Sequence, residues 1–123
     1  MSVLAAVDDL FFLARIQTTA RQVGLNLVTV ATKKLECSVT SLLAGAGVEG
    51  IVVDLSSGQA LDGIRSLKSN PQTSSVPIIG FASHVAGDVI AAARDAGCDR
   101  VLARSAFTRE LPELLRSLAA SVR

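Results

Sequence analysis

Short runs rich in β-branched and apolar residues alternate along the chain with longer segments in which apolar residues recur every three or four positions. The short runs are typical of strands buried on both faces, and the longer segments are typical of helices with one buried face. The strands are predicted at Val3–Val7, Leu25–Ala31, Gly50–Leu55, Val76–Phe81 and Arg100–Ala103. The pattern therefore predicts five strands, each followed by a helix.

The predicted helices carry their own start and stop signals. Asp9 can cap the first helix, and Gly24 stands where that helix would end. Thr32 is the expected cap of the second helix, and Gly97 is expected to stop the fourth. Proline is tolerated only in the first turn of a helix, so we expect the fifth helix to begin close to Pro112.

Strict alternation of strands and helices favours a parallel sheet with helices on both faces. Right-handed crossovers reduce the number of topologies that such a chain can adopt. We predict an α/β, flavodoxin-like fold, a doubly wound five-stranded parallel sheet of order 2-1-3-4-5. No linker or repeat interrupts the alternation, so residues 1–123 are expected to form a single domain.

Composition and charge exclude several classes of protein. Half of the residues are hydrophobic and 19% are charged, which favours a folded chain over a disordered one. The net charge of +1 argues against direct binding of nucleic acid. No apolar run reaches the roughly 18 residues of a membrane helix, and the first residues lack a basic signal region, so we expect a cytoplasmic protein away from membranes. Cys37 and Cys98 are expected to be reduced, buried thiols.

Acidic residues follow two of the predicted strands. Asp8 and Asp9 end the first strand, and Asp54 ends the third. In the predicted strand order these two strands flank the point where binding sites form. Three carboxylates there would repel one another, and Mg²⁺ is the cation that fits such oxygen ligands best. The alternative is that Asp9 only caps a helix and Asp54 only ends a strand.

The chain resembles the receiver domain of bacterial two-component response regulators over essentially its whole length. The similarity lies in five segments of the sequence. They are Val7–Asp9, Val52–Asp54, Val76–Ile79, Ala92–Asp99 and Val101–Arg104.

The resemblance implies a function for the acidic residues. Asp54 would accept a phosphoryl group from a histidine kinase or a phosphotransfer protein. Asp8, Asp9, Asp54 and the backbone carbonyl of Ser56 would bind Mg²⁺, and Arg104 would take the place of the family's lysine. On this reading the chain is a signalling protein that acts through protein contacts and is not an enzyme. Dimerisation through the fourth and fifth helices is a further option.

Four positions depart from the family pattern. Ser105 stands where the family often has a proline after a cis bond, and we expect a trans bond between Arg104 and Ser105. Ala82 stands where receivers usually carry Thr or Ser, and Ser83 could supply the hydroxyl only if the chain shifted by one residue. Arg104 keeps the charge of the lysine with a planar guanidinium. Val101 replaces the aromatic residue that commonly acts as a switch. We therefore expect an acceptor site that is present and a response to phosphorylation that is weakened.

Two other functions fit the same sequence. One is a receiver-like domain that never accepts phosphate and serves as a protein-interaction module. The other is a small enzyme on the same fold, for which His84, the one histidine, offers no catalytic arrangement. The glycines of residues 45–50 match a dinucleotide-binding pattern, but they follow a predicted helix and precede a strand, which is the wrong context.

Overall fold

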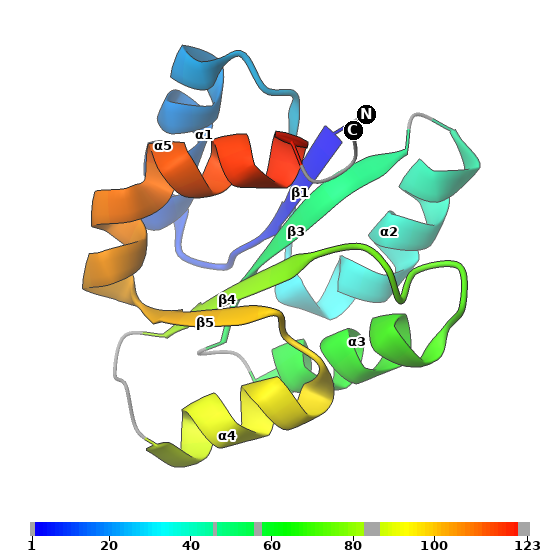
Figure 1. Cartoon of the computed structure of the whole chain (residues 1–123). Coiled ribbons are helices and arrows are strands. Elements are labelled where there is room, and N and C mark those ends of the chain that lie inside the picture. Colours follow the sequence, from blue (N-terminus) through cyan, green and yellow to red (C-terminus); the bar gives the residue numbers. More distant parts are fainter. Residues whose placement is uncertain (1, 46, 56–57, 83–86, 121–123) are drawn as a thin grey trace.

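Strands and helices alternate through the whole part of the chain that the structure, a computed structural model, describes: residues 2–45, 47–55, 58–82 and 87–120 (Figure 1). The strands are β1 (Ser2–Ala6), β2 (Leu27–Val30), β3 (Val48–Asp54), β4 (Ile78–Ala82) and β5 (Arg100–Ala103). The helices are α1 (Leu10–Val23), α2 (Leu35–Ala44), α3 (Gly58–Ser69), α4 (Gly87–Ala96) and α5 (Arg104–Ala120), with a short 3-10 turn at Thr32–Lys34 before α2. Among the described helices, none is long and apolar enough to cross a membrane.

The strands form one parallel sheet in the order β2-β1-β3-β4-β5, which confirms the predicted fold class. The register places Asp54 beside Phe81 of β4, and Phe81 beside Leu102 of β5. Because all strands run the same way, their carboxyl ends meet along one edge of the sheet. The residues that follow β1, β3 and β5 are therefore brought to that edge.

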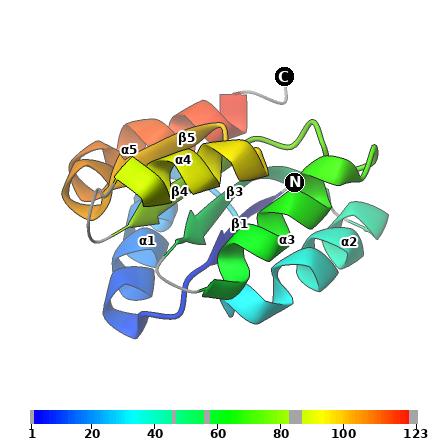
Figure 2. The ribbon, with the colours of Figure 1, turned by 90° about the horizontal axis from the view of Figure 1, so that it is seen from below.

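Helices cover both faces of the sheet, α1 and α5 on one and α2, α3 and α4 on the other (Figures 1 and 2). Alternate residues of the central strands point to opposite faces, and each face has its own core. The core under α2, α3 and α4 includes Leu35, Val39, Ile51, Ile64 and Leu67. The core under α1 and α5 includes Ile16, Val52, Phe81, Leu111 and Leu115.

Three phenylalanines form an aromatic cluster in the core under α1 and α5. Phe81 of β4 stacks on Phe12 of α1 and on Phe107 of α5, with ring centroids 4.6 Å apart in both pairs. Phe12 and Phe107 lie 5.6 Å apart, with their rings tilted by 44°. The aromatic cluster, defined here as Phe12, Phe81 and Phe107, thus joins two helices to the sheet.

The signals predicted for the first helix are confirmed. Asp9 is the N-cap of α1, and its side chain accepts hydrogen bonds from the backbone N–H groups of Phe11 and Phe12. Gly24 ends the helix in the left-handed conformation, at a φ of 78° that glycine adopts without strain.

The prediction that Thr32 caps the second helix is wrong. A 3-10 turn intervenes before α2, and its N-cap is Ala31, which makes no side-chain bond. The Thr32 hydroxyl donates instead to the carboxylate of Asp8, at 2.7 Å. A charged acceptor forms a stronger hydrogen bond than a neutral one, so a carboxylate at the end of the neighbouring strand competes well for this hydroxyl.

The predicted start of the fifth helix is also wrong. α5 begins at Arg104, directly after β5, and Pro112 lies in the middle of the helix. Pro112 has no N–H to donate to the carbonyl of Thr108, so the helix lacks one backbone hydrogen bond and its folded state is less stable at this point. The apolar face of α5, with Phe107, Leu111 and Leu115 fully buried, holds the helix together across this point.

Lys68 of α3 contacts the residues at the starts of β4 and β5, at the amino-terminal edge of the sheet. Its ammonium donates to the carbonyls of Ser74 and Val76, at 3.2 and 2.9 Å, and to Asp99 Oδ2, at 3.1 Å. The same Asp99 oxygen accepts the backbone N–H of Ile78 at 2.7 Å. One cation thereby fastens α3 to the starts of β4 and β5.

The two thiols differ in accessibility. Cys98 is buried, as expected, whereas Cys37 is exposed, so the prediction of a buried thiol is wrong at that position. Cys37 lies on α2, and the buried face of that helix is taken by Leu35 and Val39. The Cys98 thiol donates to the carbonyl of Arg100 at 3.1 Å.

We expect thiol reagents to label Cys37 readily and to spare Cys98. Burial raises the pKa of the Cys98 thiol from 9.0 to about 11, which reduces its thiolate fraction about 100-fold near neutral pH. Because the folded pKa is the higher one, the stability contributed by the protonated thiol is complete below pH 9.0 and is lost as the pH rises towards 11. Mass spectrometry after a short alkylation would show one modified site, Cys37, in the wild type. The control is Cys37→Ser, which should stay unmodified over the same time. Rapid labelling of Cys98 in the folded Cys37→Ser protein would contradict the prediction.

Candidate functional site

The acidic residues singled out in the sequence lie at the carboxyl edge of the sheet. Asp8 and Asp9 follow β1, and Asp54 is the last residue of β3, the strand beside it. Arg104 follows β5 at the same edge. The order of the strands reverses around β1 and β3, which is where binding sites form in sheets of this kind.

Asp54 is buried, with 2% of its surface exposed. Its backbone is fixed in the middle of the sheet by pairing with Phe81, and the next N–H, of Leu55, donates to the Phe81 carbonyl at 2.8 Å. The strand β3 is buried almost throughout, so the position of this carboxylate is set by a strand in the middle of the packed sheet.

Asp8 is held by Thr32, across the end of β1 and β2. The backbone N–H of Thr32 donates to Asp8 Oδ1 at 3.1 Å, and its hydroxyl donates to Oδ2 at 2.7 Å. Thr32 is itself 3% exposed. Both oxygens of the Asp8 carboxylate therefore have a partner within the protein, although Asp8 itself is exposed at the surface.

Asp9 has a partner on each oxygen as well. Its Oδ1 accepts two backbone N–H groups, of Phe11 at 3.0 Å and of Phe12 at 3.2 Å. Its Oδ2 lies 3.4 Å from Arg104 Nη1. The first pair of bonds fixes the carboxylate at the positive end of α1, and the second contact joins α1 to α5.

Arg104 lies over the aromatic cluster. Its guanidinium carbon is 4.9 Å from the ring centroid of Phe12 and 6.0 Å from that of Phe81, within the range of a cation–π contact. About a third of the Arg104 and Asp9 side chains is exposed, so solvent screening limits their ion pair to about 0–1 kcal/mol. Arg104 Nε is buried and has no acceptor among the residues that the structure describes.

The acidic residues, as arranged, do not fit a divalent cation. Within residues 2–45, 47–55, 58–82 and 87–120, no three acidic, histidine or cysteine side chains are grouped so that they could hold a metal ion. Thr32 donates to both oxygens of Asp8, and the α1 backbone and Arg104 contact the two oxygens of Asp9, so a cation would compete with these contacts. The backbone carbonyl of Ser56, predicted as a further ligand, lies outside the described residues.

The positions that depart from the receiver pattern are placed as follows. Ala82 ends β4, is 8% exposed and pairs with Ala103 of β5, while Ser83 and His84 lie outside the described residues. Val101 packs against the core under α2, α3 and α4. The peptide bond between Arg104 and the next residue is trans, and α5 follows β5 with no intervening loop.

The glycine pattern of residues 45–50 has a structural explanation. Gly45 follows α2, and Gly50 lies inside β3. A Cβ at Gly50 would come within 2.5 Å of Leu118 Cδ2 on α5. The absence of a side chain at Gly50 thus lets α5 approach the sheet, and the context required for dinucleotide binding does not occur.

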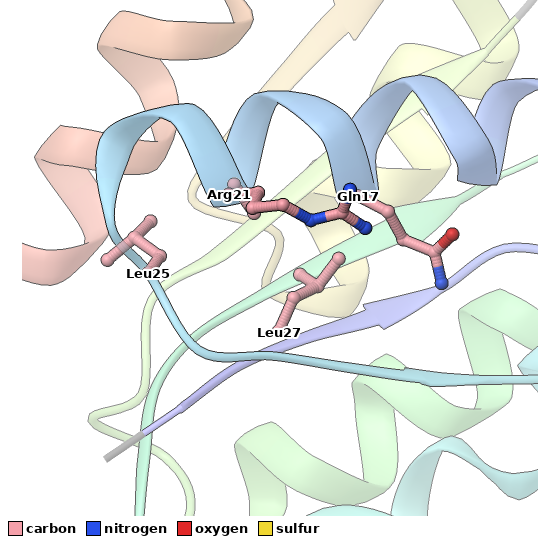
Figure 3. Close-up of a pocket in the computed structure, with 5 residues that line it drawn as sticks. Gln17, Arg21, Leu25 and Leu27 are labelled. Atoms are coloured by element: carbon pink, nitrogen blue, oxygen red, sulfur yellow. The ribbon is translucent and has the colours of Figure 1, made fainter.

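On the described surface, a hollow of about 250 Å³ lies between the 3-10 turn at Thr32–Lys34 and α3, and two others lie beside the outer strand β2. One, of about 260 Å³, is lined by Gln17, Ala20 and Arg21 of α1 with Leu25 and Leu27 opposite, away from the carboxylates (Figure 3). Another, of about 290 Å³, reaches the carboxyl edge and includes Asp8 and Leu10 in its wall. Both are shallow and open, so neither encloses a small molecule.

Two features of the site were missed in the sequence. The sequence predicts Thr32 to be a helix cap. Its position directly after the second strand, at the same edge of the sheet as Asp8, is the signal that would have predicted its contact with Asp8. The aromatic cluster beneath Arg104 comes from three distant segments, and no local pattern joins them. Both features contact the charged residues of the site.

No model of a protein family matches the chain, and no curated protein matches it by sequence. Solved structures do share its fold. A chemotaxis response regulator of Vibrio cholerae has a TM-score of 0.78 at 15% identity, with 95% of this chain and 97% of that one covered. A phosphorylated cyanobacterial phytochrome response regulator has a TM-score of 0.77 at 18% identity, covering 95% and 89%.

The Mn²⁺-bound form of another response regulator has a TM-score of 0.74 at 14% identity, covering 97% of this chain and 89% of that one. At such identities the likeness establishes the fold. The chain therefore adopts the fold of response-regulator receiver domains over most of its length.

Proposed function

We propose that the chain is a receiver module of a two-component phosphorelay, with Asp54 as the acceptor of the phosphoryl group. The observation that carries the proposal is the position of Asp54 at the end of β3, at the reversal point of a receiver-type sheet. A phosphorylated structural neighbour supports it. The module would act through contacts with other proteins and would not turn over a substrate of its own.

The chemistry required of Asp54 is a single displacement. A carboxylate oxygen attacks the phosphorus of a phosphohistidine on a histidine kinase or a phosphotransfer protein. The new oxygen–phosphorus bond forms as the phosphorus–nitrogen bond breaks, and the imidazole leaves with the electron pair and takes up a proton. The product is an acyl phosphate on Asp54 and a free histidine on the donor.

Arg104 would stabilise the transferred group. Its guanidinium lies at the same edge of the sheet, and its buried Nε is a donor with no acceptor among the described residues. A fixed cation with a free N–H can bind an oxyanion in the transition state and afterwards. Family members with a bound divalent cation add charge neutralisation at this point, but the side chains of Asp8 and Asp9 as arranged here do not fit Mg²⁺, and we assign it no step.

Protein partners have access to the site from α1. Leu10 and Phe11, at the start of this helix, are 77% and 93% exposed and lie directly after Asp8 and Asp9. Apolar surface beside the carboxylates supports docking of a phosphodonor protein there. A cytoplasmic location and a homodimer through α4 and α5 stay predictions.

A second candidate function is a protein-interaction module that does not accept phosphate. It is favoured by the burial of Asp54, by the engaged oxygens of Asp8 and Asp9, and by Ala82 and Val101 at the positions of the usual switch residues. In this form the edge around α1 would bind its partner constitutively.

Incubation with a small phosphodonor, followed by intact-protein mass measurement, separates the two functions. We expect wild type to gain one phosphoryl group and Asp54→Asn to gain none, because that change removes the attacking oxygen. Asp62→Asn is the matched control, since the Asp62 side chain on α3 is 83% exposed and pairs with Arg65 rather than with the carboxylates of the site. It should be modified as fully as wild type.

Each result decides between the candidates. An adduct on wild type and on Asp62→Asn alone supports the receiver. An adduct that persists in Asp54→Asn moves the modification to another residue and overturns the assignment of Asp54. No adduct on wild type, with the protein folded and the donor in excess, favours the constitutive interaction module.

A further inference from the structure

Arg104 and Asp9 form a contact that bears on how the carboxylates are neutralised. Asp8, Asp9 and Asp54 gather three negative charges at one edge of the sheet, and such a group is stable only if the charges are compensated. The compensation is visible in the side-chain contacts of Asp8 and Asp9. It comes from the protein itself.

The Asp9 carboxylate has little capacity left for a cation. Its Oδ1 accepts two N–H groups of α1, at 3.0 and 3.2 Å, which uses both lone pairs of that oxygen. Its Oδ2 faces the Arg104 guanidinium at 3.4 Å. A divalent cation approaching Oδ2 would meet a fixed positive charge, so binding would require Arg104 to move away.

Arg104 is held in place by more than Asp9. Its guanidinium lies on Phe12 and Phe81, both buried, and its backbone begins α5 directly after β5. A planar guanidinium stacks on aromatic rings in a way that a lysine ammonium does not. The aromatic cluster thus provides a second contact that holds the guanidinium beside Asp9.

Asp8 completes the arrangement. Thr32, itself buried, donates to both of its oxygens, at 3.1 and 2.7 Å, in a part-buried contact before α2. A metal ion would have to compete with a pre-formed hydrogen-bond pair at this residue. The two acids that precede α1 are therefore both directed towards protein donors.

We infer that Arg104 is the built-in counter-ion of this site and occupies the charge-neutralising role that a divalent cation has in metal-dependent receivers, so that the folded protein does not require Mg²⁺. The inference concerns the resting site and goes beyond the proposed function, since it holds whether or not Asp54 accepts phosphate. It predicts that Mg²⁺ binding is weak in the wild type and appears when Arg104 is replaced.

Calorimetric titration with MgCl₂, set against NaCl of equal ionic strength, tests the inference. We expect no saturable binding by wild type in the millimolar range. Arg104→Ala, and Arg104→Gln with its longer neutral side chain, should bind Mg²⁺ at least tenfold more tightly than wild type. Arg109→Ala is the matched control, because the Arg109 side chain on α5 is 76% exposed and the change removes the same charge; it should behave as wild type.

Two results would overturn the inference. One is saturable Mg²⁺ binding by wild type with the affinity of the Arg104 variants. The other is a folded Arg104→Gln protein, by circular dichroism, that gains no Mg²⁺ affinity. If both variants fail to fold, the wild-type titration and the Mg²⁺ dependence of its melting temperature still decide. The titration involves no phosphodonor, so its failure is distinct from a failure of the proposed phosphorylation.

Discussion

Phe81→Ala is expected to lower the free energy of unfolding by about 3–5 kcal/mol, the largest loss foreseen for any single change discussed here. Phe81 is fully buried and stacks on Phe12 and Phe107 at 4.6 Å. Its removal takes away apolar burial and leaves a cavity between the sheet, α1 and α5. Two partner rings on different helices cannot both collapse into that space, because their backbones are fixed by the rest of the core.

Chemical denaturation of Phe81→Ala beside Phe11→Ala measures the effect. Phe11 is 93% exposed, so its truncation removes the same atoms without opening the core, and we expect a change within about 0.5 kcal/mol. Equal losses in the two variants would show that the aromatic cluster does not hold the fold. Phe11→Ala also removes apolar surface beside Asp9 and serves as a stable variant in tests of partner docking.

Pro112→Ala is expected to raise the free energy of unfolding by about 2 kcal/mol. Pro112 lies inside α5, where it removes a backbone hydrogen bond and its ring crowds the carbonyl of Thr108. In a helix interior alanine is about 3 kcal/mol more favourable than proline. Alanine also gives the unfolded chain more conformational freedom, which lowers the free energy of unfolding by about 1 kcal/mol, so the net gain is about 2 kcal/mol. The substitution is made on a half-buried position, so the core beneath α5 is left intact.

Pro71→Ala is the control, and its expected effect has the opposite sign. Pro71 is exposed in the turn after α3, where the carbonyl of Asn70 accepts the N–H groups of Thr73 and Ser74. A turn of this kind needs no N–H from Pro71, so its loss only frees the unfolded chain and destabilises the protein by about 0.4–1 kcal/mol. Thermal melting of both variants shows the difference in sign; a destabilised Pro112→Ala protein would mean that the proline bend is required by the packing of α5.

The order of elements could be predicted because periodicity is a local property of the sequence. Buried strands such as Ser2–Ala6 are mostly apolar, and a cap such as Asp9 or a stop such as Gly24 lies next to the helix that it bounds. The predictions were wrong where contacts between residues far apart in the sequence determine the local structure. Thr32 bonds to Asp8, and Pro112 is tolerated because α5 is held by the sheet beneath it.

The residues that make up the candidate site could be predicted from the sequence, but the contacts between their side chains could not. Asp8, Asp9, Asp54 and Arg104 do lie at one edge of the sheet, because the carboxyl ends of parallel strands meet there. Whether a carboxylate faces a metal, a hydroxyl or a guanidinium depends on side-chain contacts between separate elements. The stacking of Arg104 on Phe12 is such a contact, and no spacing of residues in the sequence predicts it.

The Lys68 contacts join three elements at the amino-terminal edge of the sheet. The ammonium and Asp99 fasten α3, β4 and β5 to one another at the start of the two strands. These contacts lie at the opposite edge from Asp9 and Arg104, so the attachment of α3 to β4 and β5 is separate from the contacts that hold the charged residues. A change at Lys68 would therefore disturb the starts of β4 and β5 without removing any partner of Asp8, Asp9 or Arg104.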